Sequence, residues 1–312
     1  MEKSKRKNKS ITIILSILYF CTILTLSYFS FYYIQEIKNT KQNIKKNEEV
    51  LASLNKELLN YEDNDAKLIA QIDNLTNIDK NISDLKNEVF KSVSELEKKI
   101  RNGETNVKIA YLTFDDGPYY LTDSFLKVLD EYQVKATFFT IGADKDKCFD
   151  NRSKDCSSTY KKIVDKGHTI ANHTYSHAIF YGLYSSTSSF MNQVQKQEKL
   201  IKDRTGVTTN IIRFPGGSAT AGGLKQSIIK KLRENGYGWV DWSAQNGDGG
   251  YVATKANAWS NFTSTINGKI EVVLFHDYNY TTLSMLPDAI EYLQKNNYIL
   301  LPLFYDSVMV NK

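Results

Sequence analysis

The sequence predicts an α/β domain built on a parallel sheet, with a membrane-spanning helix and a helical stalk before it. Three observations support this prediction. Residues 11–34 contain no charged side chain, residues 35–101 contain neither Gly nor Pro, and from residue 104 onward short apolar runs alternate with amphipathic ones. Regular alternation of strands and helices favours a parallel sheet, either open or closed into a barrel.

The N-terminal segment has the length and polarity of an uncleaved signal anchor. As a helix, residues 11–34 would extend for roughly 36 Å, and the hydrocarbon core of a bilayer is about 30 Å thick. The tail of residues 1–10 carries five Lys or Arg against one Glu, which predicts a cytoplasmic N-terminus. The apolar run exceeds the core of a cleavable signal peptide. A single-pass membrane protein with an extracellular domain is therefore expected.

Residues 35–103 are predicted to form a helical stalk. Apolar residues recur there in steps of three and four, a heptad-like spacing typical of coiled coils. They are Leu51, Leu54, Leu58, Tyr61, Leu68, Ile72 and Leu75, followed by Ile82, Leu85, Val89, Val93, Leu96 and Ile100. A stalk that self-associates into a homo-oligomer is favoured over a lone helix folded back on the next domain. Gly103 is the expected end of the helix.

Seven strands are predicted after residue 104, with helices between most of them. They are 108–114, 136–141, 168–172, 210–214, 238–242, 270–276 and 298–303. One intervening helix, LKQSIIKKLREN, should end at the C-cap glycine Gly236. Ligands of parallel α/β sheets bind at the carboxyl ends of the strands, so the residues at these ends are the candidate functional residues of the domain of residues 104–312.

Charge and cysteine content exclude some classes of protein. The formal net charge is +5 and the pI is near 8.8, and no Lys/Arg block with interleaved aromatics is present, so nucleic-acid binding is not expected. No CxxC pair occurs, which excludes a structural zinc finger. Cys148 and Cys156 would lie outside the cell, where either a disulfide or free thiols are possible.

Ionisable side chains gather at the predicted carboxyl ends of the strands. In chain order they are Asp115, Asp116, His173, His177, Arg213, Asp241 and His276. Three of the four histidines of the chain are among them. An Asp-Asp-Gly turn with solvated carboxylates is the simple alternative for the first pair. The gathering of so many groups at one edge favours a functional site.

The residue types fit a catalytic metal site. Two histidines four residues apart, His173 and His177, can direct both imidazoles at one point, and a carboxylate from a neighbouring strand completes a His, His, Asp set with open positions. A bound cation offsets the repulsion between Asp115 and Asp116. One aspartate can then be a ligand while the other serves as a general base.

Five motifs, TFDDGP, HTYSH, RFPGG, VDWS and LFHD, resemble in order and spacing those of the polysaccharide deacetylases, carbohydrate esterase family four with a NodB-like domain. The resemblance covers about residues 108–305. It implies a distorted (β/α)7-type barrel and metal-dependent removal of N-acetyl groups from polymeric amino sugars, commonly with zinc. By position, Asp116, His173 and His177 match the family's metal ligands and Asp115 matches its catalytic base.

The resemblance also implies roles for residues of the later motifs. Arg213 matches the arginine that positions the base, Asp241 the residue that orients the acid, and His276 the catalytic acid. Leu274 matches the residue that lines the acetyl-methyl pocket. The family often has a tyrosine whose backbone N–H completes the oxyanion hole; this sequence has Gly216 there, which keeps the donor on a freer loop.

Aromatic residues beside the motifs are candidates for sugar binding, although packing is the more common role of such residues. They are Tyr119, Tyr120, Trp242, Tyr278 and Tyr280. The expected function is that of a membrane-anchored peptidoglycan N-acetylglucosamine deacetylase of the cell envelope. The alternatives are deacetylation of N-acetylmuramic acid or of an exopolysaccharide, and a wall-binding protein with an inactive enzyme domain.

Overall fold

The computed structural model describes residues 30, 33–46, 48, 49, 51, 91–142, 156–250 and 254–304. The chain divides into two compact units, Met1–Val89 and Phe90–Lys312. The predicted cytoplasmic tail, residues 1–10, and the predicted membrane span, apart from residues 30, 33 and 34, lie outside the described residues. In the part of the chain that is described, no helix combines the length and apolar character needed to cross a bilayer.

The predicted stalk is described in two pieces. Residues 33–46 and 91–101 are helical, and residues 52–90 lie outside the described part. The second helix is followed by a turn at Gly103, whose φ is 73°. The coiled-coil seam and the self-association of the stalk stay predictions.

The last turns of this helix belong to the second unit and pack against its sheet. Glu97 and Ile100 are 3% and 4% exposed, and the buried hydroxyl of Tyr111 donates a hydrogen bond to the Glu97 carboxylate. Tyr111 lies in the middle of β1 (Lys108–Asp115). The folded domain therefore begins before residue 104, the boundary expected from the sequence.

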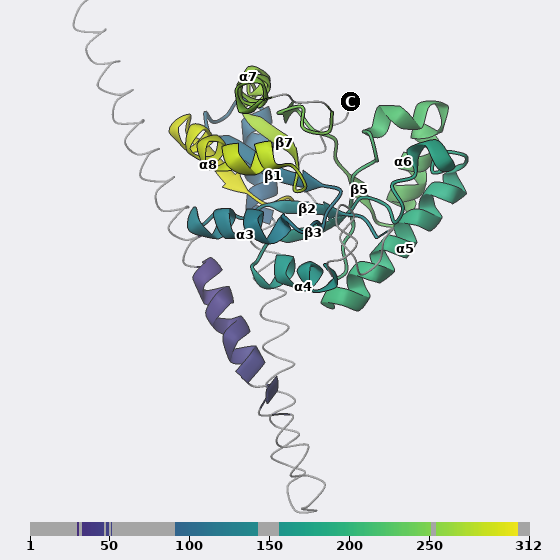
Figure 1. Ribbon diagram of the computed structural model, residues 1–312, viewed down its shortest axis with the longest axis horizontal. Helices are drawn as coiled ribbons and strands as arrows, with labels where there is room; N and C mark the ends of the chain where they lie inside the picture. The colour runs from purple at the N-terminus through teal and green to yellow at the C-terminus, as the bar shows by residue number, and fades with distance from the viewer. Residues whose placement is uncertain are drawn as a thin grey trace, which may run out of the picture. The chain divides into compact units, whose positions relative to one another are not determined.

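The second unit is built on a sheet of eight parallel strands (Figure 1). After β1 come β2 (Thr137–Thr140), β3 (Thr169–Asn172), β4 (Ile211–Ile212), β5 (Gly238–Trp239), β6 (Ala244–Gln245), β7 (Ile270–His276) and β8 (Tyr298–Leu301). The order in the sheet is β5-β4-β3-β2-β1-β7-β6, and β8 pairs with β1. The predicted parallel sheet is confirmed.

Two details differ from the sequence-based prediction. Each of the seven predicted strands overlaps an observed strand, but β6 was not predicted, because Ala244 and Gln245 stand between polar residues and form no apolar run. The outer strands β5 and β6 do not pair with each other in the described part of the chain. The sheet is therefore curled and open at one side, a partial form of the expected (β/α) barrel.

In the described residues from 91 onward, six helices and two 3-10 turns connect the strands. The helices are α3 (Thr122–Glu131), α4 (Ser157–Asp165), α5 (Thr187–Thr205), α6 (Lys225–Glu234), α7 (Lys255–Thr265) and α8 (Tyr280–Lys295), and the turns are η1 (Ile179–Tyr181) and η2 (Ser218–Leu224). The sequence-predicted helix ahead of Gly236 corresponds to α6, and Gly236 has a φ of 76° as a C-cap glycine requires.

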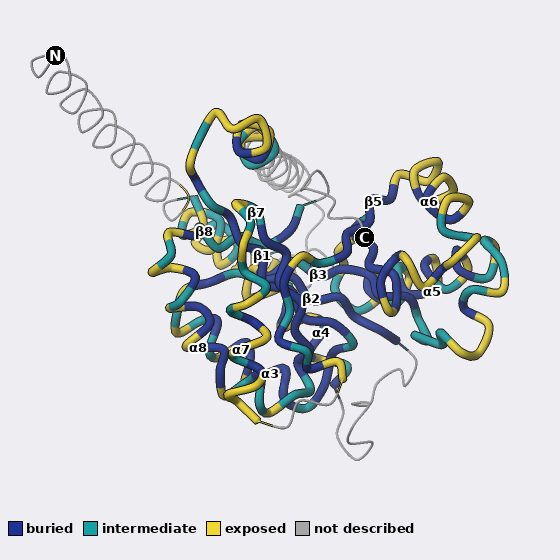
Figure 2. Tube along the Cα trace, turned by 90° about the horizontal axis from the view of Figure 1, so that it is seen from above, coloured by how far each residue is buried: buried dark blue, intermediate teal, exposed yellow. Residues whose placement is uncertain are grey.

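Burial on both faces explains the apolar strands. In β1 every residue from Ile109 to Asp115 is buried, and Figure 2 shows the sheet buried while the outer helix surfaces are exposed. One apolar cluster joins β1, β2 and β7 to α3 and α8, and a second joins β4 and β5 to α5 and α6. Continuous apolar runs of this kind are typical of parallel strands covered on both faces.

The register of the strands brings the candidate site residues to one level. Asp115 pairs with His276 across the β1–β7 ladder, and with Phe139 across the β1–β2 ladder. On the other side, Asn172 at the end of β3 pairs with Ile212 at the end of β4. The residues that follow these positions therefore meet at the carboxyl edge of the sheet.

Candidate active site

Asp116, His173 and His177 form a cluster that could hold a metal ion. One ligand atom from each of the three residues lies within 4.8 Å of the other two. Asp116 Oδ1 is 3.4 Å from His173 Nε2 and 3.3 Å from His177 Nε2. Asp116 and His177 have φ angles of 70° and 49°. Left-handed backbone is costly for residues other than glycine and is found where a site requires it.

The protonation and hydrogen bonding of this cluster fit a divalent cation. Asp116 Oδ1 is buried and has no hydrogen-bond partner among the residues that the structure describes. Burial, with the nearby His177, lowers the pKa of His173 to about 3, so its imidazole is neutral. Its Nδ1 lies 2.9 Å from the Arg213 carbonyl, which can only accept, so Nδ1 carries the proton and Nε2 presents a lone pair. A carboxylate and a neutral imidazole are the forms that bind metals.

Asp115 lies beside this cluster and is held by a buried arginine. Arg213 Nη1 donates to Asp115 Oδ1 at 2.8 Å and to Thr113 Oγ1 at 2.7 Å. The guanidinium also donates to the Val240 and Asp241 carbonyls, both at 3.2 Å. Burial raises the pKa of Asp115, and the charge of Arg213 opposes this rise. Asp115 Oδ2 faces His173 Nε2 at 3.6 Å, which places an oriented proton acceptor at the cluster.

His276 also faces the cluster of Asp116, His173 and His177, and Asp248 holds its imidazole. The distance from His276 Nδ1 to Asp248 Oδ1 is 2.7 Å, and the His276 backbone N–H donates to Asp248 Oδ2 at 2.9 Å. His276 Nε2 is 3.7 Å from Asp116 Oδ2. Burial lowers the pKa of His276, but the hydrogen bond and charge of Asp248, with the charge of Asp116, outweigh burial and raise that pKa to about 9. The imidazole is therefore protonated at neutral pH and can act as a general acid.

The expectation that Asp241 orients the acid is corrected by this arrangement. Both Asp241 carboxylate oxygens accept from Ser218, at 2.8 Å from its N–H and 2.5 Å from its hydroxyl. Asp241 thus ties the loop after Gly217 to the end of β5 and, through its carbonyl, supports Arg213. The orienting residue is Asp248, which the sequence reasoning missed because it lies beyond β6, the strand that was not predicted.

A second layer of contacts fixes Asp248. Thr282 Oγ1 donates to Asp248 Oδ2 at 2.5 Å, and Asn246 Oδ1 accepts from the Asp248 backbone N–H at 3.1 Å. Asn246 Nδ2 in turn donates to Thr282 Oγ1 at 2.8 Å. The stretch NGDGG could have suggested this aspartate, because glycines allow a close approach of the backbone to a site.

The three residues expected to contact substrate lie around the same edge. Gly216 follows Pro215 with a φ of 73°, and a Cβ there would lie 2.9 Å from Thr220 Oγ1 and 3.2 Å from Ile179 Cδ1, so the fold itself requires glycine. Trp242 packs on the loop, with its Cη2 3.1 Å from the position of a Cβ at Gly217. Leu274 precedes His276 by two residues in β7 and so points to the same face of the sheet.

A substitution at Gly249 tests how closely the His276 imidazole is held in place. A Cβ at Gly249 would lie 2.7 Å from His276 Cε1, whereas a Cβ at Gly250 would meet only the Gly247 carbonyl at 3.7 Å. Neither glycine has a positive φ. We expect Gly249→Ala to displace the imidazole and to lower kcat by up to about 10²-fold, the scale of a misplacement near 1 Å. Gly250→Ala is the matched control, and metal content should be unchanged in both variants. Equal kcat values for the two would contradict this account.

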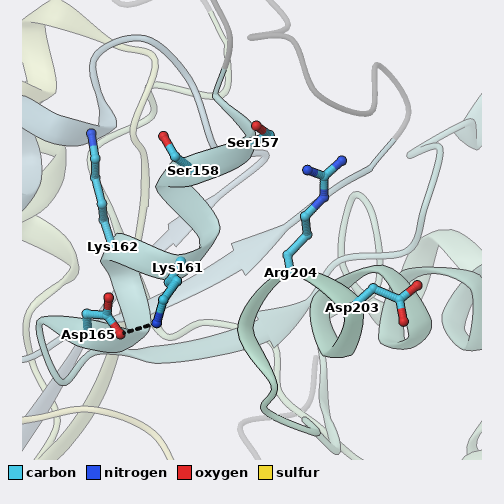
Figure 3. A pocket seen from close by; sticks show the side chains of 7 residues that line it. All are labelled: Ser157, Ser158, Lys161, Lys162, Asp165, Asp203 and Arg204. Carbon is cyan, nitrogen blue, oxygen red and sulfur yellow. Dashed lines mark hydrogen bonds and ion pairs between the residues drawn. The ribbon is translucent and has the colours of Figure 1, made fainter. Parts of the chain in front are cut away.

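A surface depression between α4 and α5 lies apart from this cluster. Figure 3 shows its lining, which is Ser157, Ser158, Lys161, Lys162, Asp165, Asp203 and Arg204. Lys161 pairs with Asp165 at 2.9 Å and Lys162 with Asp123 at 2.7 Å. None of these lining residues belongs to the cluster of Asp116, His173 and His177, and neither Asp115 nor His276 is among them. Nearby, Cys156 is disulfide-bonded, and the other two cysteines lie outside the described residues.

The fold and this site together define a class of protein. A curled parallel sheet carries, at its carboxyl edge, the candidate metal site of Asp116, His173 and His177, with an arginine-bound carboxylate and a protonated imidazole beside it. This arrangement is suited to hydrolysis. Residues 102–239 match the family model described as polysaccharide deacetylase. A peptidoglycan-N-acetylglucosamine deacetylase from Bacillus cereus is 30% identical over 196 residues, covering 61% of this chain and 67% of the relative. The chain belongs to the polysaccharide deacetylase family.

Other similarities agree with this membership. A Bacillus subtilis relative named a polysaccharide deacetylase is 29% identical over 198 residues, and the chain spans 65% of its length. The catalytic domain of a peptidoglycan N-acetylglucosamine deacetylase from Eubacterium rectale superposes with a TM-score of 0.59 at 31% identity, covering 66% of this chain and 92% of that chain. A polysaccharide deacetylase from Bacillus cereus gives a TM-score of 0.58 at 28% identity, with coverages of 65% and 96%.

Proposed function

We propose that this protein is a metal-dependent deacetylase that hydrolyses the N-acetyl groups of peptidoglycan N-acetylglucosamine at the cell envelope. The observation that carries the proposal is that Asp115 and His276 both face the Asp116, His173 and His177 cluster, at 3.6 Å from His173 and 3.7 Å from Asp116. The names of the relatives from Bacillus cereus and Eubacterium rectale support the choice of substrate.

The three cluster residues would hold a divalent cation, and zinc is the metal we propose because two imidazoles and one carboxylate suit it. When bound, the cation supplies Lewis-acid polarisation of the amide carbonyl. Asp115, oriented by Arg213, takes the proton from the attacking water. The backbone N–H of Gly216 is the proposed donor to the developing oxyanion, and Leu274 lines the space for the acetyl methyl group.

Departure of the amine depends on a general acid, and we assign this role to His276. The amide nitrogen is a poor leaving group until it is protonated, and His276 Nε2 is the group placed to donate that proton. Because Nδ1 of His276 faces the Asp248 carboxylate, the ring keeps its orientation while Nε2 gives up the proton. The products are acetate and a free amino sugar, and His276 regains a proton from solvent.

Acetate release from purified peptidoglycan fragments tests this function. We expect the full-length protein to release acetate, a chelator to stop the release, and added Zn²⁺ to restore it. The treated fragments should contain glucosamine in place of N-acetylglucosamine when their masses are determined. Acetate release that continues unchanged after complete removal of divalent metal would refute the metal-dependent mechanism.

The same mass analysis separates the alternatives. Loss of the acetyl group from N-acetylmuramic acid, or release from an exopolysaccharide but not from peptidoglycan, would move the substrate to those polymers. An inactive wall-binding protein would bind the fragments without releasing acetate. The aligned acid and base disfavour this last alternative, because binding alone needs neither.

We also propose that residues 11–34 anchor the chain in the membrane with residues 1–10 in the cytoplasm, and that the stalk of residues 35–103 holds the domain outside. The uncharged run and the basic tail of the sequence support this topology. A protease added to intact protoplasts should then release the domain. Its protection from the protease would argue against both the orientation and a wall substrate.

A further inference from the structure

Exposed aromatic side chains lie beside the candidate active site. Among the described residues of the second unit, the exposed large apolar side chains are Phe180, Tyr181, Val207 and Tyr280. Phe180 and Tyr181 are each 90% exposed, and Tyr280 is 61% exposed. Phe180 and Tyr181 follow the cluster residue His177 by three and four residues, and Tyr280 follows the acid His276 by four. Among the described residues of the second unit, the exposed aromatics therefore all lie within four residues of a site histidine.

Phe180 and Tyr181 are held on a fixed turn, η1. The Ile179 N–H donates to the His177 carbonyl at 2.9 Å, and the N–H groups of Tyr181 and Leu183 donate to the Ala178 carbonyl at 3.0 and 3.1 Å. Leu183 is 2% exposed and belongs to the second apolar cluster, against which Ile179 also packs. The two exposed rings thus sit between anchored neighbours, so presenting them to a ligand costs little conformational entropy.

Tyr280 is likewise held by its neighbours. Its hydroxyl accepts a hydrogen bond from Tyr120 at 2.7 Å, and the two ring centroids are 6.1 Å apart. The preceding tyrosine of the first loop, Tyr119, packs edge to face on Tyr278, with ring centroids 4.9 Å apart. Tyr119 is only 5% exposed, which makes it a supporting residue and not the sugar contact considered from the sequence.

The sheet order places the two aromatic groups on opposite sides of β1, the strand that leads to Asp116. Phe180 and Tyr181 follow β3, Tyr280 follows β7, and β1 with Asp115 and Asp116 lies between these strands. Three strand spacings of about 4.8 Å separate β3 from β7, which is roughly 14 Å. Because the strands that lead to these two groups are separated by more than one sugar ring at the sheet, a chain of sugars is the ligand suited to contact both groups.

We propose that Phe180 and Tyr181 on one side, and Tyr280 on the other, bind the sugar rings that flank the one being deacetylated. This inference rests on the proposed function and adds that the substrate is a polymer recognised on both sides of the reacting unit. The faces of pyranose rings carry C–H groups, which pack on the electron-rich faces of aromatic rings. Exposed aromatic surface next to a site marks a place of binding, and the absence of charge on these side chains suits neutral sugars.

Chain-length dependence of deacetylation tests the proposal. We expect kcat/KM of the full-length protein to rise from single N-acetylglucosamine to its oligomers. The double variant Phe180→Ser, Tyr181→Ser and the single variant Tyr280→Ser should each lose part of this rise, by about 10-fold and mainly through KM, with activity on the shortest substrate unchanged. Val207→Ser is the matched control, since Val207 is an exposed apolar residue that follows α5 and no strand.

Co-sedimentation with insoluble peptidoglycan gives a readout that does not depend on turnover. The Phe180 and Tyr181 double variant should bind less than the wild type, and Val207→Ser should bind equally. This result would support the aromatic subsites even if no acetate were released, in which case only the proposed function would fail. Equal binding and equal chain-length dependence in all variants would overturn the inference. So would a change in the association state of the double variant with no change in polysaccharide binding, because the surface would then contact a second copy of the chain.

Discussion

Asp115→Asn is expected to lower turnover by roughly 10² to 10⁴, the usual scale for the loss of a general base, while metal content stays at the wild-type level. The substitution keeps the shape of the side chain and removes its ability to accept a proton. Asp115 is not part of the metal cluster, and its Oδ1 is bound by Arg213 at 2.8 Å. Acetate-release rates and metal analysis of the same preparations measure both quantities.

The buried arginine makes a folding control necessary for this variant. Arg213 is 0% exposed, and a buried charge that loses its partner destabilises a protein, by about 3–5 kcal/mol. The Asn oxygen can still accept from Arg213 Nη1, so the thermal unfolding midpoint should fall far less for Asp115→Asn than for Asp115→Ala. Loss of the metal in folded Asp115→Asn would show that Asp115 is a ligand and that the roles of the two aspartates are reversed.

Asp116→Ala is expected to remove metal and activity together. Asp116 Oδ1 faces both imidazoles of the cluster at 3.3 and 3.4 Å, so the variant leaves two ligands of three. Excess divalent metal should restore part of the activity by mass action, whereas it should do nothing for Asp115→Asn. Asp123→Ala is a suitable control, because it removes an exposed carboxylate of α3 that forms an ion pair with Lys162 at 2.7 Å.

Retention of metal by Asp116→Ala would place the cation elsewhere. Full activity in both aspartate variants would mean that the pair is only a turn, as the simplest interpretation of Asp-Asp-Gly allows. If only a turn were needed, glycine at this position would adopt the left-handed backbone without strain. Asp116 adopts it with a φ of 70°, which argues that its carboxylate is needed there.

The sequence was sufficient to predict the parallel sheet and the gathering of residues at its carboxyl edge. Strands such as β1 and β7 are long and mostly apolar, and both end in an ionisable residue, so their ends could be located from the chain alone. Because parallel strands align their carboxyl ends, the meeting of Asp115 and His276 followed from this pattern, and the observed register pairs them.

The partner of the acid could not be predicted for a physical reason. β6 is two residues long and is specified by its pairing with β7 rather than by its own sequence. Asp248 reaches His276 only because the chain turns through Gly247, whose φ is 82°, after that short strand. A contact that depends on tertiary pairing of this segment leaves no apolar pattern in the sequence. The family resemblance pointed instead to Asp241, which follows β5.

The packing of helical residues 91–101 on β1 has a consequence for how the domain is cut out of the chain. Family similarity begins at residue 102, so a fragment designed on that boundary would omit Glu97 and Ile100, which are buried against the sheet. It would also remove the Glu97 carboxylate, which accepts a hydrogen bond from the Tyr111 hydroxyl in the strand that ends at Asp115. Limited proteolysis in solution should therefore leave a resistant core whose first residue lies near 91, and that core is the unit suited to crystallisation.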